Sequence, residues 1–414
     1  MTTRLPLLAA ALAAAALTSG PARAEFGLTI LHINDLHSRI EPISRFDNTC
    51  AADADAAGEC FGGVARIKTA LKQRRAALGN RPVLTLDAGD QFQGSLFYAT
   101  YKGAAEAEFM SQMGFDAMAV GNHEFDDGPE KLAEFIDAVP FPVLSTNTNV
   151  AADPLLAERV SPYTVIERGG VRIGIISALA TDTDETSSPG PTVSFEDEIA
   201  TLQAAVDTLT RQGIRHIIAL THVGLPRDIE IAAMTRGIDA IVGGHSHTLM
   251  HDTAEGAEAP YPLMIANPDG IMVPVVQAYA YGKYLGELSL TFDEHGVVTA
   301  ADGEPILLDA SYTPDPEIVA RVAALGAPIE ALKAEVIGET TAAIDGERTS
   351  CRVRECEMGA LVATAMLERA RPLGAHVAIQ NGGGLRASIE PGEITKGDVL
   401  TVLPFQNTLA TFDL

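Results

Sequence analysis

Short runs of aliphatic and β-branched residues alternate along this chain with stretches of helical periodicity, and this alternation limits the available folds more than any other feature. The helical stretches include Val64–Leu78, Lys131–Ala138 and Glu198–Gln212. The strands that we predict are Leu28–Ile33, Val83–Leu86, Ala117–Val120, Val171–Ile176, His216–Leu220, Ala240–Val242, Leu263–Ile265, Val275–Tyr279 and Glu287–Phe292. This order predicts an α/β fold. Because the late strands lack long intervening helices, we expect that part of the fold to be partly antiparallel.

Two prolines interrupt this pattern. The sequence Thr313-Pro314-Asp315-Pro316 ends the first α/β segment, and Glu317–Lys333 then has the spacing of one amphipathic helix. A second α/β pattern begins near Glu335. The chain has 414 residues and 47% hydrophobic composition, which is enough to bury two cores. We therefore expect two domains joined by a helix.

The first 24 residues have the pattern of a secretory signal peptide. Arg4 precedes an apolar run over Leu5–Leu17, and Ala22-Arg23-Ala24 has the small-x-small form of a cleavage site before Glu25. The alternative is a buried N-terminal helix. No later run reaches the roughly 18 apolar residues of a membrane-spanning helix. We expect a periplasmic or secreted protein with no integral membrane segment after cleavage.

The four cysteines fall into two close pairs, Cys50 with Cys60 and Cys351 with Cys356. Four cysteines allow three disulfide connectivities, and the local one closes two short loops without joining the halves of the chain. Unpaired thiols are the alternative. Neither pair has the CxxC spacing of a zinc site. We expect two local disulfides, which suit an oxidising compartment.

The chain is strongly acidic, with a formal net charge of −26 and a pI of about 4.7. Such a surface repels the phosphates of nucleic acids, so we expect no nucleic acid polymer as a partner. A smaller anionic ligand would need concentrated local positive charge, and bound metal ions supply it well.

Polar clusters follow five of the predicted strands directly. They are Asn34-Asp35-Leu36-His37, Asp87-Ala88-Gly89-Asp90, Gly121-Asn122-His123-Glu124-Phe125-Asp126, Thr221-His222 and Gly243-Gly244-His245-Ser246-His247. The carboxyl ends of strands are where α/β sheets place their ligands. One such cluster alone is more typical of a hydrogen-bonded loop, but five in order predict a metal site. Imidazole, carboxylate and amide groups together suit transition metals better than Ca²⁺ or Mg²⁺.

Two other polar residues near these motifs receive structural interpretations. Asp87 is expected to cap a turn, and His32, inside a predicted strand, is expected to be a structural histidine.

The ordered motifs DLH, GDQFQG, GNHEFD, TH and GGHSH, with FPVLSTN, PVVQAYAYGKYLG, CRVREC and NGGGLR, resemble the 5′-nucleotidases of the calcineurin-like metallophosphoesterase superfamily. The resemblance implies a four-layer αββα metallophosphoesterase sandwich followed by a smaller α/β substrate-binding domain. Together with the signal peptide over residues 1–24 and the proline-marked boundary, this gives a catalytic domain over 25–312, a linker helix over 313–334 and a substrate-binding domain over 335–414. Relatives continue well beyond Leu414, so we expect the second domain to be truncated here.

The resemblance also implies a ligand set for two divalent transition-metal ions, Zn²⁺, Mn²⁺ or Co²⁺. Asp35, His37, Asp90 and His247 match the ligands of one ion, and Asp90, Asn122, His222 and His245 match those of the other. His123 and Asp126 match the catalytic dyad of the family. Asp126, three residues after His123, can bond the imidazole and favour its cationic form.

The second domain is expected to select the substrate. The residues that match substrate-binding positions, with Asn122 of the first domain, are Arg348, Arg352, Asn381, Arg386, Phe405 and Asn407. Arginine forks suit phosphate oxygens, and an exposed phenylalanine suits the face of a base. For Phe405, packing at a strand end is the alternative.

These patterns predict a metal-dependent 5′-nucleotidase that releases phosphate from nucleoside 5′-monophosphates by means of a metal-activated water. The alternative within the same fold is an enzyme that keeps the metal ions but hydrolyses another substrate class, namely UDP-sugars, 2′,3′-cyclic nucleotides or sulfur esters. A non-catalytic nucleotide-binding surface protein is the alternative from another class, and it would not need the His123–Asp126 dyad.

Overall fold

The structure is a computed structural model that describes residues 25–412 except 46, 48, 404–406 and 408. Two six-stranded sheets form its centre. The first has the order β14-β13-β1-β2-β3-β4, with bounds Val298–Leu307, Tyr284–Phe292, Phe26–Ile33, Val83–Asp87, Ala117–Ala119 and Val143–Leu144. The second has the order β11-β12-β10-β9-β7-β6, with bounds Leu263–Ala266, Met272–Val276, Ala240–Val242, His216–His222, Val171–Leu179 and Tyr163–Arg168.

Three apolar layers hold these sheets and their helices together. One lies between the sheets and contains Leu28, Ile30 and Ile175, each with no exposed surface. A second joins the outer face of the first sheet to helices, and a third does the same for the second sheet. Leu28 and Ile30 face one side of β1 and Leu31 faces the other, as the two-residue period of a strand requires. The result is the expected αββα sandwich.

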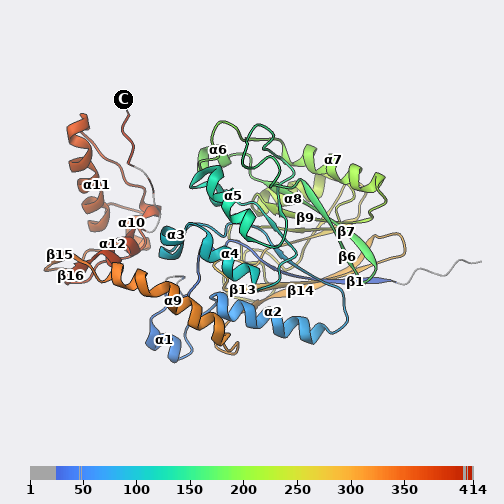
Figure 1. Ribbon diagram of the computed structural model, residues 1–414, viewed down its shortest axis with the longest axis horizontal. Coiled ribbons are helices and arrows are strands. Elements are labelled where there is room, and N and C mark those ends of the chain that lie inside the picture. The colour runs from blue at the N-terminus through green and yellow to red at the C-terminus, as the bar shows by residue number, and fades with distance from the viewer. Residues whose placement is uncertain (1–24, 46, 48, 404–406, 408, 413–414) are drawn as a thin grey trace, which may run out of the picture.

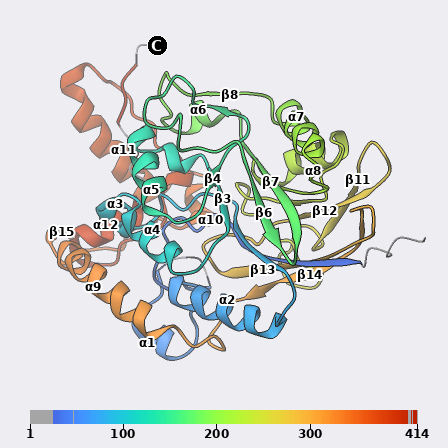
Figure 2. The ribbon, with the colours of Figure 1, turned by 45° about the vertical axis from the view of Figure 1, so that its right-hand side comes forward.

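Helices cover both outer faces, with α2 and α7 on opposite sides of the sheets (Figures 1 and 2). The helices over the first sheet are α2 (Val64–Leu78), α3 (Leu96–Tyr101), α4 (Ala104–Ser111), α5 (Gly128–Ala138) and part of α9 (Pro316–Lys333). Those over the second are α7 (Glu198–Arg211) and α8 (Leu225–Met234). Short elements in the connections are α1 (Ala52–Ala56), η1 (His123–Phe125), α6 (Thr183–Thr186) and the β5–β8 pair, Thr148–Asn149 with Ser194–Phe195.

All nine predicted strands are present, with small shifts in their bounds. The largest shift is at the predicted strand Val275–Tyr279, which is β12, Met272–Val276. The late part is partly antiparallel as expected, since β13 pairs antiparallel with both β1 and β14. The ten-residue strand β14 was not predicted. Its sequence Asp302-Gly303-Glu304-Pro305 is typical of a turn, but an edge strand tolerates proline.

The helix α9 leads from the sandwich to the C-terminal part of the chain. Asp315 caps it by accepting hydrogen bonds from the backbone N–H groups of Glu317 and Ile318, at 3.2 and 3.1 Å. Its side chains Ile318 and Ile329 are buried in the core of the sandwich. Figures 1 and 2 show α9 running beneath α3 toward α12.

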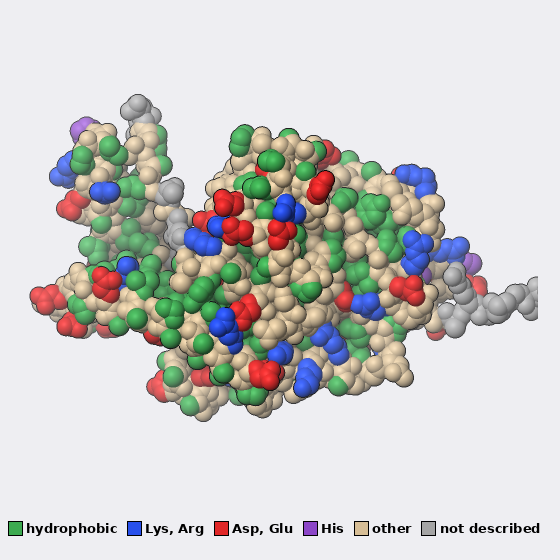
Figure 3. Space-filling view, viewed as in Figure 1, with side chains coloured by type: hydrophobic (Ala, Val, Ile, Leu, Met, Phe, Trp, Pro, Cys, Tyr) green, Lys and Arg blue, Asp and Glu red, His purple; other side chains and the backbone are tan. Residues whose placement is uncertain are grey.

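The C-terminal part is smaller and more open. Its elements are β15 (Val336–Thr340), α10 (Arg348–Cys351), α11 (Glu357–Ala370), η2 (Arg371–Leu373), η3 (Gly382–Gly384), β16 (Gly392–Thr395) and α12 (Lys396–Val402). Its core includes Met358, Leu385 and Val402. Figure 3 shows hydrophobic side chains exposed over this part, at the left of the view. Among the described residues, no helix combines the length and apolar composition needed to cross a bilayer.

Candidate metal centre and catalytic pocket

The loops with the predicted metal ligands meet at one edge of the sandwich. Strands β1, β2 and β3 are parallel in the first sheet, and β9 and β10 are parallel in the second. Their carboxyl ends therefore deliver the five polar clusters to a common edge. Five residues in these loops have a left-handed backbone conformation, with φ between 49° and 79°. They are Asp35, His37, Asp90, His245 and His247. Non-glycine residues rarely adopt this conformation, and where they do they cluster at functional sites.

One group of ligand atoms comes from Asp35, His37 and His247, which lie within 4.8 Å of one another. Nε2 of His247 is 3.3 Å from Oδ1 of Asp35 and 2.9 Å from Nε2 of His37. Nδ1 of His37 lies 3.3 Å from the Phe92 carbonyl. Burial lowers the pKa of His37 to about 3, so the imidazole is neutral and its Nε2 can offer a lone pair to a cation.

A second group comes from Asp90, His222 and His245. Nδ1 of His222 is 2.7 Å from the Ala88 carbonyl and donates to it, which leaves Nε2 unprotonated in the neutral ring. This Nε2 is buried, has no hydrogen-bond partner in the described part of the chain, and faces Oδ2 of Asp90 at 3.1 Å. Nδ1 of His245 is 2.9 Å from Oδ1 of Asn122.

Asp90 connects the two groups, because its ligand atom also lies within 4.8 Å of those of His37 and His123. Its Oδ2 lies 3.7 Å from Nε2 of His37, in addition to its contact with His222. Although burial opposes ionisation of Asp90, the imidazoles of His222 and His123 hold its pKa well below the ordinary value. A Cβ atom at Gly244 would lie 2.8 Å from the Ala88 carbonyl oxygen and 3.0 Å from Asp35 Oδ2, so only glycine allows the loop to approach this closely.

This donor set fits divalent transition-metal ions. Buried imidazole nitrogens and carboxylate oxygens face one another at distances that leave lone pairs without donors, and a cation satisfies both. Burial disfavours a positive charge on His222, but Asp90 and Asp35 outweigh it and raise its pKa to about 10. The added proton lies on Nε2, because Nδ1 already donates to the Ala88 carbonyl, and a metal ion bound to Nε2 would take the place of that proton.

The predicted dyad lies beside these ligands. Nδ1 of His123 is 2.7 Å from Oδ2 of Asp126, three residues later, across the short helix η1. Burial disfavours the cation of His123, but Asp90 and Asp126 outweigh it and raise the pKa of the imidazole to about 9. The His123 side chain remains 28% exposed, which leaves one edge of the ring accessible to a ligand.

Glu124 was not singled out from the sequence, yet it joins the two central loops. Its fully buried carboxylate accepts hydrogen bonds from four backbone N–H groups: Gln91 (2.8 Å), Phe92 (3.2 Å), Asp90 (3.0 Å) and Gly121 (2.6 Å). Burial and the Asp90 carboxylate raise the pKa of Glu124 to about 7, and these bonds act against that shift. The motif GNHEFD contains this residue, but the sequence does not show which backbone it contacts.

A cavity of about 280 Å³ opens onto the metal ligands and the dyad. The residues that line it are His37, Arg39, Asp90, Gly94, Asn122, His123, His245, His247, Tyr281 and Arg386. Arg386, predicted to bind substrate, reaches it from the C-terminal part. Arg39 and Tyr281 were not predicted. Arg39 lies two residues after His37, but His37 and Ser38 form a turn with φ of 49° and 55°, so the two-residue spacing of a strand does not predict the position of Arg39.

Among the described residues, the predicted substrate-binding residues Arg352, Asn381 and Asn407 do not line this cavity. Asn381 instead caps η3, because its Oδ1 accepts a hydrogen bond from the Gly383 N–H at 3.0 Å. Arg352 and Asn407 are exposed. Phe405 and the side chain of Arg348 lie outside the described residues. Residues 1–24, the predicted signal peptide, also lie outside them.

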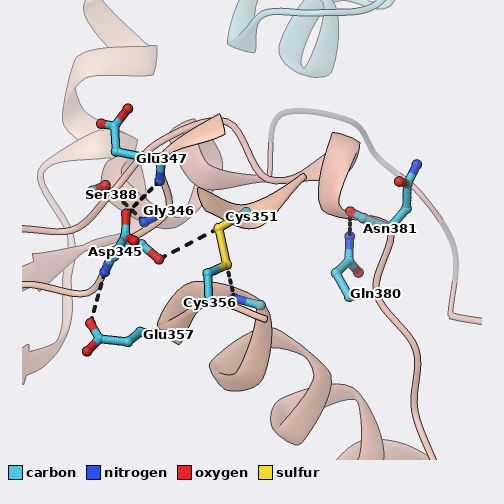
Figure 4. Close-up of a disulfide and its surroundings, with 10 residues drawn as sticks. Asp345, Gly346, Glu347, Cys351, Cys356, Glu357, Gln380, Asn381 and Ser388 are labelled. Atoms are coloured by element: carbon cyan, nitrogen blue, oxygen red, sulfur yellow. Dashed lines mark hydrogen bonds between the residues drawn. A yellow bond between two sulfur atoms is a disulfide. The ribbon is translucent and has the colours of Figure 1, made fainter. Parts of the chain in front are cut away.

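Both predicted disulfides are confirmed. Cys50 is bonded to Cys60 and Cys351 to Cys356, so each closes a short loop within one part of the chain. Figure 4 shows the second bridge between α10 and the start of α11, where Cys356 Sγ also accepts from the Gly359 N–H.

Both structural interpretations near the motifs are also confirmed. Asp87 accepts a hydrogen bond from the Gly89 N–H at 3.0 Å and holds the turn before Asp90. His32 is fully buried and its Nε2 lies 2.7 Å from the Tyr261 hydroxyl.

Comparison with known proteins identifies two families along the chain. Residues 28–249 match the calcineurin-like phosphoesterase family, and residues 336–414 match the 5′-nucleotidase C-terminal domain. The chain is 42% identical to a 5′-nucleotidase of Homo sapiens over 95% of its own length and 70% of that protein. It is 40% identical to a snake venom 5′-nucleotidase of Naja atra over 94% of its length and 75% of that protein.

Solved structures agree. The 5′-nucleotidase precursor of Thermus thermophilus is 41% identical, with a TM-score of 0.81, over 92% of this chain and 75% of that one. The NAD nucleotidase of Haemophilus influenzae is 28% identical, with a TM-score of 0.72, over 92% of this chain and 75% of that one. With the metal-ligand groups, the dyad and the cavity at one edge of an αββα sandwich, these likenesses show that the chain belongs to the 5′-nucleotidase family of metallophosphoesterases and is a phosphohydrolase.

Proposed function

We propose that the cavity hydrolyses the phosphate ester of nucleoside 5′-monophosphates, with Asp35, His37, Asp90 and His247 binding one divalent metal ion and Asp90, Asn122, His222 and His245 binding the other. The observation that carries this proposal is the single cavity that contains ligand atoms of both groups, His123 and an arginine of the C-terminal part. Bound divalent ions supply Lewis acidity toward phosphoryl oxygens and make water easier to deprotonate.

The side chains of the protein have complementary tasks in this proposal. Nδ1 of His123 is engaged by Asp126, so Nε2 is the nitrogen available to a ligand in the cavity. A proton held there can pass to the departing 5′ oxygen or stabilise charge on the phosphoryl group. Asn122 and Arg386 offer N–H donors to phosphoryl oxygens, and the arginine can bind two oxygens at once.

We infer the domain boundaries from the same pattern: catalytic domain 25–312, linker helix 313–334 and substrate-binding domain 335–414, after a signal peptide over residues 1–24. The break between the two matched families, at residues 249 and 336, supports a division in this region. Export to the periplasm or secretion is supported by the two disulfides, which form in oxidising compartments. One relative is a snake venom 5′-nucleotidase, and venom is a secreted fluid.

A substrate panel tests the reaction. We expect the purified protein, loaded with Mn²⁺, Co²⁺ or Zn²⁺, to release phosphate from AMP with a higher kcat/KM than it shows for UDP-glucose, 2′,3′-cyclic AMP or a sulfur ester. Turnover of one of those three in preference to AMP would reassign the substrate. Absence of metal-dependent turnover on every substrate would favour the binding protein.

A substitution at Phe405 tests whether the protein prefers nucleotides to phosphate esters without a base. Stacking of one base on an aromatic ring contributes about 1–3 kcal/mol, so Phe405→Ala should raise KM for AMP by roughly 5- to 150-fold. Hydrolysis of inorganic pyrophosphate or a sugar phosphate, which have no base, serves as the control and should change much less. Equal losses on AMP and the control would assign Phe405 to packing.

A further inference from the structure

The carboxylate of Asp126 is the meeting point of three loops. Its Oδ2 accepts from Nδ1 of His123 at 2.7 Å and from Nε2 of Gln93 at 3.1 Å. Its Oδ1 accepts from the hydroxyl of Ser187 at 2.8 Å. Gln93 belongs to the loop after β2, whereas Ser187 follows β7 in the second sheet and belongs to none of the metal motifs.

The segment that carries Ser187 is well anchored. Thr183 is fully buried, and its hydroxyl donates to the Ala180 carbonyl at 2.7 Å. The Ser187 N–H donates to the Thr183 carbonyl at 2.9 Å, which closes the short helix α6. The backbone of Ser187 is extended, with φ −149° and ψ −162°. The hydroxyl is therefore presented to Asp126 from a fixed position.

Ser187 is the only donor to Oδ1 of Asp126 in the part of the chain that the structure describes. The carboxylate is held at both oxygens, so it cannot rotate without breaking a hydrogen bond. Because Oδ2 orients the imidazole of His123, the hydroxyl of Ser187 limits the orientations of that ring through the carboxylate. Ser187 does not line the cavity, so it acts without touching a ligand there.

We propose that Ser187 is a positioning residue for the hydrolysis, and that it acts by fixing the Asp126 carboxylate and through it the His123 imidazole. The role rests on the proposed phosphoester hydrolysis. It gives the α6 segment a part in catalysis that the metal-binding motifs do not require. Gln93 shares Oδ2 with His123 and supports the same carboxylate from the opposite loop.

The test compares Ser187→Ala, Ser187→Thr and Ser188→Ala. Ser188 is the adjacent residue of the same kind and is exposed, so its substitution is the matched control. We expect Ser187→Ala to lower kcat by roughly 5- to 20-fold, at or below the lower end of the effect of one hydrogen bond to a charged acceptor, because Ser187 acts on the imidazole only through Asp126. KM, metal content and melting temperature should match the wild type. Threonine restores the hydroxyl, suits extended backbone and should restore most of kcat.

A double-mutant cycle separates this route from a general structural effect. In a His123→Ala background the carboxylate has no imidazole to position, so Ser187→Ala should cause little further loss. An undiminished additional loss, a wild-type kcat in Ser187→Ala, or a loss that follows metal content or melting temperature would each overturn the proposal.

The assays use AMP and 4-nitrophenyl phosphate side by side. If the wild type hydrolyses only the second, the nucleotide assignment fails, and the comparison of the Ser187 variants still decides their role.

Discussion

The substitution Glu124→Gln removes half of the acceptors that join the two central loops. The carboxylate uses Oε1 for the N–H groups of Gln91 and Phe92 and Oε2 for those of Asp90 and Gly121. A glutamine has one oxygen and one NH₂ group, and an NH₂ group cannot accept from an N–H. Either orientation of the amide therefore leaves two backbone donors unpaired, and at least one of them belongs to the loop of Asp90.

The loss of stability can be estimated from the burial of the unpaired N–H groups. Each buried N–H group without an acceptor destabilises the folded state by about 1–3 kcal/mol, so two amount to about 2–6 kcal/mol. Glutamine also removes a carboxylate whose ionisation is opposed by burial and by Asp90, which raise its pKa to about 7, and this offsets part of the loss. We expect a net destabilisation of about 2–4 kcal/mol, a large fraction of the roughly 5–15 kcal/mol typical of a folded protein.

Two measurements check this prediction. Urea unfolding of chelated protein, followed by circular dichroism, should show a lower midpoint for Glu124→Gln than for Glu130→Gln, an exposed Glu-to-Gln change six residues later. Hydrogen exchange read by mass spectrometry should be faster in peptides that cover 89–92 and 120–124. If the two variants share one midpoint and these amides stay protected, the argument from the four hydrogen bonds is wrong.

Three further predictions follow. Exhaustive chelation should abolish phosphate release from AMP, and Mn²⁺, Co²⁺ or Zn²⁺ should restore it, because the proposed reaction depends on bound metal ions. Full activity in chelated protein, with metal content measured, would end the two-metal proposal. His123→Ala should lower kcat by roughly 10²–10⁴-fold with unchanged metal content, and loss of metal would make His123 a ligand instead. Burial raises the pKa of Glu106 from 4.5 to about 7, so the folded state keeps a proton that the unfolded chain loses. The free energy of unfolding of the wild type, relative to that of Glu106→Gln, should thus be greatest below pH 4.5 and fall by about 3 kcal/mol by pH 7. A difference in unfolding midpoints that stays constant over this pH range would contradict the prediction.

The sequence predicted the strands and the loops that follow them because both rest on local patterns. A buried strand such as Ala117–Val120 is apolar on both faces, and the first polar residue after it, Asn122, lies at the edge of its sheet. Strand β14 escaped prediction because its residues alternate little and include Pro305. Its pairing with β13 depends on a partner that sequence periodicity does not reveal.

The supporting residues of the site were harder to predict, since their partners are distant in sequence. Glu124 is read naturally as one more polar residue of GNHEFD, yet it contacts backbone 32 to 34 residues earlier. Ser187 has no motif around it and meets Asp126 across 61 positions. Such roles appear only when loops that are distant in sequence are brought to one edge of the sandwich.

Backbone conformation at the proposed metal ligands also departs from the usual rules for turns. Glycine is expected where φ is positive, but Asp35, His37, Asp90, His245 and His247 occupy that region themselves. Their N–H groups and carbonyls are held by neighbouring loops; for example, Asp35 N–H donates to the Gly89 carbonyl at 2.9 Å. The paired sheets fix both ends of each loop, so the unfavourable conformations persist where their side chains must converge.

The net charge of −26 raises the question of how the chain attracts a phosphate. Exposed charges are screened over about 8 Å at physiological ionic strength, so the acids of distant surfaces matter less than the groups inside the cavity. There, Arg39 and Arg386 line the same cavity of about 280 Å³. Burial and the nearby Arg386 lower the pKa of Arg39, because two cations repel each other in a partly desolvated space.

The surroundings of Arg39 keep its charge directed at the cavity. Its guanidinium lies 5.2 Å from the centre of the Tyr281 ring and donates to the Gly94 carbonyl, while Nε is buried without a partner in the described part of the chain. A phosphoryl group that enters the cavity relieves the repulsion between the arginines and supplies oxygens to their donors. Arg39 belongs to the sandwich and Arg386 to the C-terminal part. Both positive charges therefore face the cavity only when the C-terminal part lies against this edge of the sandwich. An acidic protein can thereby bind a small anion at one point despite its net negative charge.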